Sequence, residues 1–237
     1  MRARQRHLNW RDRCGLYLDS RYINQSNASA VSSWSDRSGN SRNVSNGTGT
    51  QQPIYTTNAI GGNGAVEFDG SNDRLVGSSV NWYQYVTAFF VAQSDDTAAT
   101  KGQYVFWDGN TNQSGGSFHY GILYGNTTFF GKGWQKTNPP YAEADVSTPG
   151  GLGSWVIGSA ELSAASNVWE NGAVPSAKTT GNGSMTNNSY IFQIGYEGFW
   201  QFDGKIALVA VFTAALDAPL RKRYEKCAGY SFKIACS

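Results

Sequence analysis

The stretch Lys205-Ile206-Ala207-Leu208-Val209-Ala210-Val211-Phe212 decides the fold, because every position after the lysine is apolar. Successive residues of a strand face opposite sides of its sheet, so a continuous apolar run predicts a strand that is buried on both faces. Such a strand lies at the centre of a sheet. Its second face can be covered by loops, by the segment that follows it, or by another chain.

A helix is predicted directly after this strand. Asp217 is a typical N-cap and Pro219 suits the first turn. The apolar residues that follow recur at helical spacing and form one stripe, which consists of Leu216, Leu220, Tyr224 and Cys227. It is the one helix that we predict in this chain.

The rest of the chain is typical of short strands joined by turns. Strands are expected at 15–19, 87–93, 103–107, 117–124, 127–130, 154–159 and 167–170. Hairpins are expected around Asp69-Gly70 within 64–75, around Asn171-Gly172, and between 190–195 and 202–212. We assign three tryptophans to the core, namely Trp34, Trp155 and Trp169.

Composition agrees with a single β domain. The 237 residues include 28 glycines, and aromatic residues reach 14% against 15% charged. Turn signals recur at roughly 8 to 12 residues, which is typical of a sandwich. We therefore predict an all-β, two-sheet antiparallel jelly-roll sandwich over 14–237 with one short C-terminal helix, and no segment apolar enough to span a membrane.

Residues 1–13 are predicted to be a basic arm. Five arginines lie there, namely Arg2, Arg4, Arg6, Arg11 and Arg13. With Asp12 they give the segment a net charge of +4, so that the rest of the chain carries −2 and the whole chain +2. No apolar run follows them, so we expect no signal peptide. An arm of this kind can bind nucleic acid, an acidic membrane surface or an acidic protein patch, and it can also be a solvated tail.

Six short pieces, in order, resemble the laminin-G-like jelly-roll family of the concanavalin A-like superfamily. The resemblance covers roughly residues 14 to 230. The pieces are Leu16-Tyr17-Leu18-Asp19, Trp34-Ser35-Asp36-Arg37-Ser38-Gly39-Asn40, Ala65-Val66-Glu67-Phe68-Asp69-Gly70 with Asp73 and Leu75, Val168-Trp169-Glu170-Asn171-Gly172, Ile194-Gly195, and Phe202-Asp203-Gly204-Lys205-Ile206-Ala207. The final helix departs from the family pattern at Leu216-Asp217-Ala218-Pro219-Leu220-Arg221.

The resemblance implies two curved sheets with rim loops that in relatives bind glycans, proteins or calcium. The domain also looks like those that bacteriophages carry as head-decoration, fibre or tail components. By this analogy we expect a non-enzymatic virion accessory protein that docks on capsid or tail proteins through its arm and presents loops to host-surface glycans. The alternatives are an extracellular bacterial carbohydrate-binding module and a glycoside hydrolase with an unrecognised site. A homo-oligomer stays open.

Candidate carbohydrate ligands are aromatic residues beside Asn and Asp, because ring faces stack on sugars while amides and carboxylates bind hydroxyls. Two stretches qualify: the one that starts at Trp107 and the loop 136–140 between Trp134 and Tyr141. The candidate set is Trp107, Asp108, Asn110, His119, Tyr124, Trp134 and Tyr141. Each aromatic residue, taken alone, is more often part of a core.

Catalytic and metal sites have weaker signals. Related glucanases use a Glu-x-Asp strand that continues to a second Glu, whereas Glu143-Ala144-Asp145 here does not. Asp69 and Asp73 are expected to cap a turn, while Asp95 and Asp96 are the better candidates for calcium. Cys14, Cys227 and Cys236 form no metal-binding spacing, and a single bridge among them stays open.

Overall fold

The computed structural model describes residues 13–81, 86–95, 102–107, 117–123, 128–134, 142–147, 153–162, 167–171, 189–197 and 200–236. For β10, β11 and β12 the description is that of the backbone and its pairing. The predicted arm lies outside the described residues except for Arg13, so the boundary at 13/14 stays a prediction.

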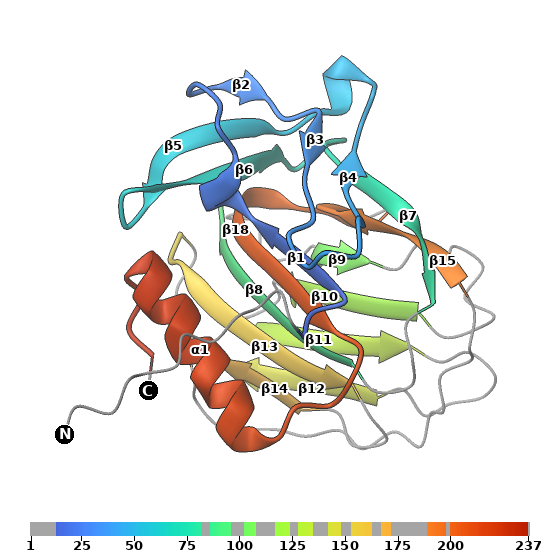
Figure 1. Cartoon of the computed structure of the whole chain (residues 1–237), viewed down its shortest axis with the longest axis vertical. Coiled ribbons are helices and arrows are strands. Elements are labelled where there is room, and N and C mark those ends of the chain that lie inside the picture. The colour runs from blue at the N-terminus through green and yellow to red at the C-terminus, as the bar shows by residue number, and fades with distance from the viewer. Residues whose placement is uncertain are drawn as a thin grey trace.

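The first sheet has eight strands, all in antiparallel pairs (Figure 1). Seven of the strands form a continuous order across the sheet, and the eighth, β1, pairs with β18. In order they are β14 (Asn167–Glu170), β13 (Val156–Leu162), β8 (Val86–Ser94), β18 (Asp203–Phe212), β6 (Asn63–Asp69), β5 (Ile54–Ile60) and β2 (Ser29–Ala30), with β1 (Leu16–Asp19) beside β18.

The second sheet also has eight strands and packs face to face with the first (Figure 1). In order they are β12 (Ala142–Ser147), β11 (Thr128–Trp134), β10 (Ser117–Leu123), β9 (Gly102–Trp107), β15 (Ser189–Ile194), β7 (Leu75–Asn81), β4 (Val44–Ser45) and β3 (Ser33–Trp34). The remaining elements are the pair β16 (Tyr196–Glu197) and β17 (Trp200–Gln201), the 3-10 turns η2 (Ser20–Tyr22) and η3 (Gly49–Gln51), and α1 (Ala218–Phe232). The predicted all-β sandwich with one C-terminal helix is confirmed.

β18 is the central strand of the first sheet, as its sequence predicts. It pairs with β8 along one edge, while β6 and then β1 occupy the other edge. The register with β8 shifts between Ile206 and Leu208, so Ala207 and Leu208 both face away from the second sheet. Ile206, Val209 and Val211 face the core between the sheets.

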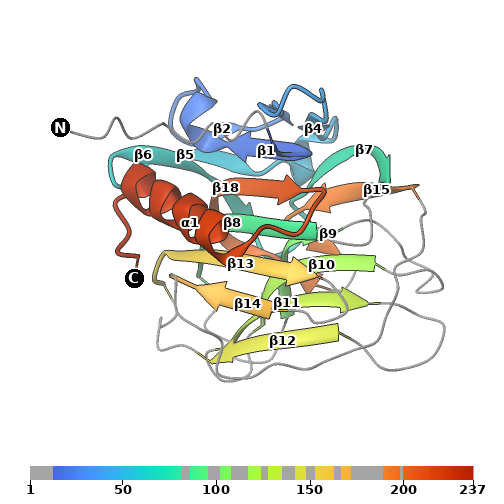
Figure 2. The same cartoon turned by 60° about the horizontal axis from the view of Figure 1, so that its bottom comes forward.

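The outer face of the first sheet is covered by α1 (Figure 2). Asp217 caps the helix, since its carboxylate accepts from the Leu220 backbone N–H at 2.8 Å. Tyr224, Ala228 and Phe232 are buried against Phe89, Phe212 and their neighbours. Leu216, Leu220 and Cys227 pack partly on the same cluster, so the predicted apolar stripe is confirmed.

Two predicted hairpins are wrong. Asp69-Gly70 does form a turn, yet the strands that flank it, β6 and β7, belong to different sheets, so the turn carries the chain across the sandwich. Residues 190–195 and 202–212 are likewise separated, because β15 pairs with β7 and β9 while β18 lies in the first sheet. β14 pairs with β13, and the residues after Asn171 that would complete the third hairpin lie outside the described residues.

The three tryptophans assigned to the core differ in burial. Trp34 is 1% exposed and packs between the sheets, as predicted. Trp155 is only partly buried, against the layer under α1, and Trp169 is half-buried with the Arg221 guanidinium 3.8 Å above its ring. For these two the prediction is wrong, because neither side chain is fully buried.

Candidate functional site

The register of the second sheet brings three predicted ligands together. Trp107 on β9 lies opposite His119 on β10, and Trp134 on β11 lies opposite Ser117, two positions from His119 on the same strand. Residues directly opposite each other share a face of the sheet, and so do residues two apart. Positions 107, 119 and 134 therefore share one face across three adjacent strands.

This shared face is the outer face of the sheet. Phe106 lies opposite Ile194, and both are buried in the core between the sheets. Trp107 is the neighbour of Phe106 and lies opposite Gln193, so its position falls on the other face. Ile191, which belongs to that face of β15, is 52% exposed. We call it the outer face of the second sheet.

One row of paired positions crosses five strands on the outer face. From β15 to β12 the row consists of Gln193, Trp107, His119, Lys132 and Glu143. A second row consists of Tyr104, Gly121, Phe130 and Asp145. The two rows combine aromatic residue types, a cation and carboxylates, which together can stack on sugar rings and bind hydroxyl groups.

Sequence reasoning missed Lys132, Phe130 and Glu143 as members of this surface. The signal that could have found the first two is the alternation in Phe130-Gly131-Lys132-Gly133-Trp134, where each non-glycine residue falls on the same face. β12 was not predicted at all, so Glu143 was considered only as a fragment of a catalytic strand. It lies on the last strand of the sheet order, opposite Lys132.

Some of the candidate residues lie outside the described residues, and their roles stay predictions. These residues are Asp108, Asn110, Tyr124 and Tyr141 among the sugar ligands, Asp96 among the calcium ligands, and Arg2, Arg4, Arg6 and Arg11 in the arm.

Asp95 has a partner of its own. Its carboxylate lies 2.5 Å from the ammonium of Lys205, which is also 3.6 Å from Glu67. Burial lowers the pKa of Lys205, but the hydrogen bond and charge of Asp95, with the charge of Glu67, outweigh it, so that the pKa is raised. A carboxylate that neutralises a lysine is a poorer calcium ligand. Among the described residues, no group of three or more His, Cys, Asp or Glu could hold a metal ion.

Asp69 and Asp73 form a turn, as predicted. The Asp69 Oδ1 accepts from the backbone N–H groups of Ser71 and Asn72 at 2.9 and 3.2 Å, and Asp73 accepts from the Asp69 N–H at 3.0 Å. Burial, and then the charge of Asp69, raise the pKa of Asp73 to about 6. Asp36 orders its loop in the same way, through Tyr17, Ser38 and Arg42.

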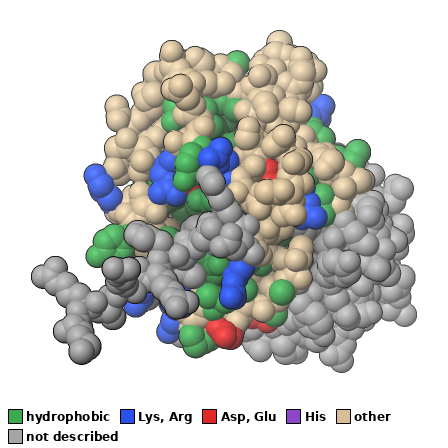
Figure 3. Space-filling view, in the orientation of Figure 1, with side chains coloured by type: hydrophobic (Ala, Val, Ile, Leu, Met, Phe, Trp, Pro, Cys, Tyr) green, Lys and Arg blue, Asp and Glu red, His purple; other side chains and the backbone are tan. Residues whose placement is uncertain are grey.

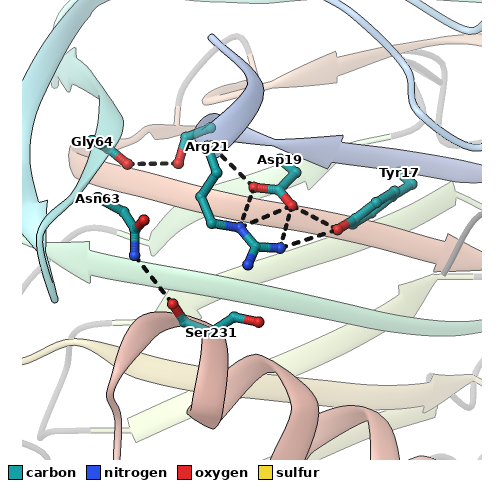
Figure 4. Close-up of polar contacts among 7 residues, drawn as sticks. Tyr17, Asp19, Arg21, Asn63, Gly64 and Ser231 are labelled. Carbon is teal, nitrogen blue, oxygen red and sulfur yellow. Dashed lines mark hydrogen bonds and ion pairs between the residues drawn. The ribbon is translucent and has the colours of Figure 1, made fainter. Parts of the chain in front are cut away.

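A buried polar network joins the beginning and the end of the domain (Figure 4). The carboxylate of Asp19, which is fully buried, accepts from the Arg21 guanidinium at 2.6 Å and from the Tyr17 hydroxyl at 2.6 Å. Arg21 lies 5.0 Å over the Phe232 ring of α1, and Asn63 donates to the Ser231 carbonyl at 3.1 Å. Because every group here has a partner within the chain, we interpret the network as structural.

A polar hollow of about 180 Å³ lies beside this network, lined in part by Asn24, Gln25, Ser33 and Ser35. Ligand pockets usually measure about 300 to 1,000 Å³. The hollow is smaller than that range, so the outer face of the second sheet is the better candidate for an extended ligand.

No protein-family model matches the chain, and no curated protein matches it in sequence. In structure it is similar to the ligand-binding domain of botulinum neurotoxin serotype D in complex with N-acetylneuraminic acid, at a TM-score of 0.63 and 15% identity over 91% of this chain and 51% of that chain. It is also similar to the binding domain of botulinum neurotoxin DC in complex with rat synaptotagmin II. The TM-score is 0.64 and the identity 13%, over 92% of this chain and 52% of that chain.

A structure of botulinum neurotoxin type C, whose cell entry depends on two ganglioside molecules, gives a TM-score of 0.64 and 14% identity over 92% of this chain and 52% of that chain. The chain thus spans about half the length of these structures. At such identities the similarity shows the fold, a two-sheet β-sandwich. Membership of the laminin-G-like family stays a prediction. No helix in the described residues is long and apolar enough to cross a membrane.

Proposed function

We propose that this chain is a non-enzymatic carbohydrate-binding domain whose ligand lies across the outer face of the second sheet. The observation that carries the proposal is the row of opposed positions Trp107, His119, Lys132 and Glu143, with Trp134 on the same face. Four adjacent strands, β9 to β12, thus offer two aromatic residues for stacking and polar residues for hydroxyl groups.

The similar solved structures add support from outside the chain. Botulinum neurotoxin serotype D was solved with N-acetylneuraminic acid, and type C depends on gangliosides for entry. Both ligands are carbohydrates or carry them. Since about half of each of those chains is matched, no binding residue is transferred from them, and the proposal depends on the register of this sheet.

A glycan array with sialylated, neutral and bacterial-surface saccharides tests the proposal. For the best ligand, Trp107→Ala and Trp134→Ala should each weaken binding by about tenfold or more, as loss of a central aromatic contact does. Tyr22→Ala is the matched control, because Tyr22 is an aromatic residue 53% exposed elsewhere on the surface. Unchanged melting temperatures exclude misfolding. An array without signal, or equal losses in all three variants, would refute the proposal.

Absence of catalysis is part of the same proposal. The catalytic strand of related glucanases carries a Glu, an Asp and a second Glu on one face, because retaining hydrolysis needs an acid and a nucleophile about 5 Å apart. Glu143 and Asp145 share the outer face of β12, but Ser147 stands where the second Glu would follow. Release of reducing sugars from a polysaccharide panel, lost in Glu143→Gln, would show a glycoside hydrolase instead.

We also propose that the domain is displayed on a virion and is attached through residues 1–13. Five arginines in that segment support attachment, since an Arg-rich arm fits an acidic patch on a neighbouring subunit. Purified native particles should contain the chain in a fixed ratio to capsid or tail subunits, and a chain that lacks 1–13 should fold but not attach. A glycan-binding chain that is absent from particles would favour the extracellular bacterial module.

A further inference from the structure

We propose that the exposed side of α1 is a docking surface for an acidic peptide segment of a protein partner, one with an apolar side chain between its carboxylates. This surface lies on the helix side of the first sheet and is separate from the outer face of the second sheet. The proposal does not depend on glycan binding.

The docking surface is a stripe of cations around one aromatic ring. It consists of Lys222, Lys226, Tyr230 and Lys233, with Arg223 beside them, and all five are exposed. Steps of four residues keep Lys222, Lys226 and Tyr230 on one side of the helix, with about 6 Å of rise for each step. Lys233 is the C-cap that follows the last turn, and it lines the same hollow as Lys226 and Tyr230. Tyr230 is 90% exposed, more than any other large hydrophobic residue described.

No acidic residue of the helix neutralises the stripe. Glu225, 1% exposed, is turned inward and bonded to Arg221 and Ser159. None of the ion pairs found among the described residues involves a cation of the stripe. Figure 3 shows more Lys and Arg than Asp and Glu side chains on the face that carries α1. The stripe therefore offers net positive charge to a partner.

A hollow of about 450 Å³ lies at the C-terminal end of the stripe, lined by Lys226, Gly229, Tyr230, Lys233, Ile234 and Cys236. It forms because the chain folds back over the last helical turn: Lys233 has φ 56°, and the Ile234 N–H donates to the Gly229 carbonyl at 3.0 Å. Gly229 is needed there, since a Cβ would lie 2.8 Å from the Ile234 carbonyl oxygen. An apolar wall between two ammonium groups suits an apolar side chain flanked by carboxylates.

The geometry favours an acidic protein over a nucleic acid or an anionic membrane as the partner. A helix that reads a nucleic-acid duplex enters its groove, whereas α1 lies flat with Tyr224, Ala228 and Phe232 buried in the sheet. The sequence pI of about 8.4 is also below the value above 9 that is typical of nucleic-acid-binding domains. A helix that inserts into a membrane interface needs an apolar face, but that face of α1 is already buried.

The predicted arm begins on the same side of the molecule. Cys14 is buried in the same apolar cluster as Tyr224 and Phe232, so the chain enters the domain under the helix-covered face. Arg13, the residue before Cys14, is exposed.

The test uses the full chain and a fluorescein-labelled peptide with a central phenylalanine between alternating aspartates and glutamates. Fluorescence anisotropy at low salt should show binding that weakens as salt rises. The triple variant Lys222→Gln, Lys226→Gln, Lys233→Gln should bind at least tenfold more weakly. The matched control Ser45→Asp, Thr50→Glu, Ser79→Glu removes the same three units of net charge at exposed positions and should bind almost as the parent chain does. Tyr230→Ala should weaken the binding of this peptide more than it weakens the binding of a peptide that has serine at its centre.

Several outcomes would overturn the proposal: equal loss in the control, equal binding of the peptide with Asn and Gln in place of its acids, or no binding at all. Tighter binding of a DNA duplex or of phosphatidylserine vesicles at the same salt, lost in the lysine variant, would reassign the surface to those partners. A glycan array that fails while the peptide binds, or the reverse, separates this proposal from the glycan-binding one.

Discussion

Replacing Asp73 with asparagine should stabilise this protein at neutral pH. Asp73 is 8% exposed, in the turn between β6 and β7, and burial, followed by the charge of Asp69, raises its pKa to about 6. Its Oδ2 accepts from the Asp69 backbone N–H at 3.0 Å, which an amide oxygen can also do. The substitution therefore removes an unfavourable charge while it keeps the hydrogen bond.

The sign and size of the effect follow from proton linkage. The pKa of an unfolded aspartate is about 3.9, so between about pH 4 and pH 6 the folded state holds a proton that the unfolded chain has released. The stability of the wild-type protein should fall as pH rises through this window and stay reduced above it. A shift of about two units corresponds to an upper bound of about 3 kcal/mol at pH 7.5.

Urea unfolding at pH 4, 5, 6 and 7.5 measures the difference between Asp73→Asn and the parent chain. The two should be nearly equal in stability at pH 4 and should separate progressively to pH 7.5, with the variant the more stable. Asp217→Asn is the control, an exposed aspartate that caps a helix through its side chain. A difference at pH 7.5 no larger than at pH 4, or a destabilised variant, would refute the reasoning.

Three further substitutions test the fold. Gly204→Ala should destabilise by about 3 kcal/mol or more, measured by urea unfolding, because φ is +140° and a Cβ would collide with the Gln93 carbonyl oxygen in β8. Asp217→Ala should cost about 1 kcal/mol through loss of the helix cap, while Asp217→Asn should cost little. Asp19→Asn should lower stability by about 2 kcal/mol or more, because the Arg21 guanidinium would lose its charged partner; a loss as small as that of a surface change would show that solvent replaces that partner.

Local signals in the sequence were enough for some elements. The apolar run of β18 and the cap, proline and stripe of α1 each lie within a short segment, and the structure confirms them. β5 was missed because Thr56, Thr57 and Asn58 interrupt its apolar residues, and its register with β6 shifts there. Asp69-Gly70 signals a reversal, but a reversal does not say whether the next strand pairs with the previous one or crosses to the other sheet.

The candidate site depends on information that is not local. Trp107 and Trp134 were predicted as ligands from two separate stretches, and no pattern within one strand tells which positions lie opposite each other in the next. Asp95 illustrates the same limit, since its partner Lys205 is 110 residues away in the chain. An acid that looked free enough to bind calcium is in fact held by the central strand.

The central strand also explains why two binding surfaces can coexist. Because β18 is apolar on both sides, the first sheet has to be covered twice, by the second sheet and by α1. That requirement turns the cationic side of α1 outward and leaves the second sheet to offer its outer face. Glycan binding and peptide docking would then lie on opposite sides of one sandwich, too far apart to share residues. A chain that combines Trp107→Ala with the triple lysine variant should therefore lose as much glycan affinity as Trp107→Ala alone. It should lose as much peptide affinity as the triple lysine variant alone.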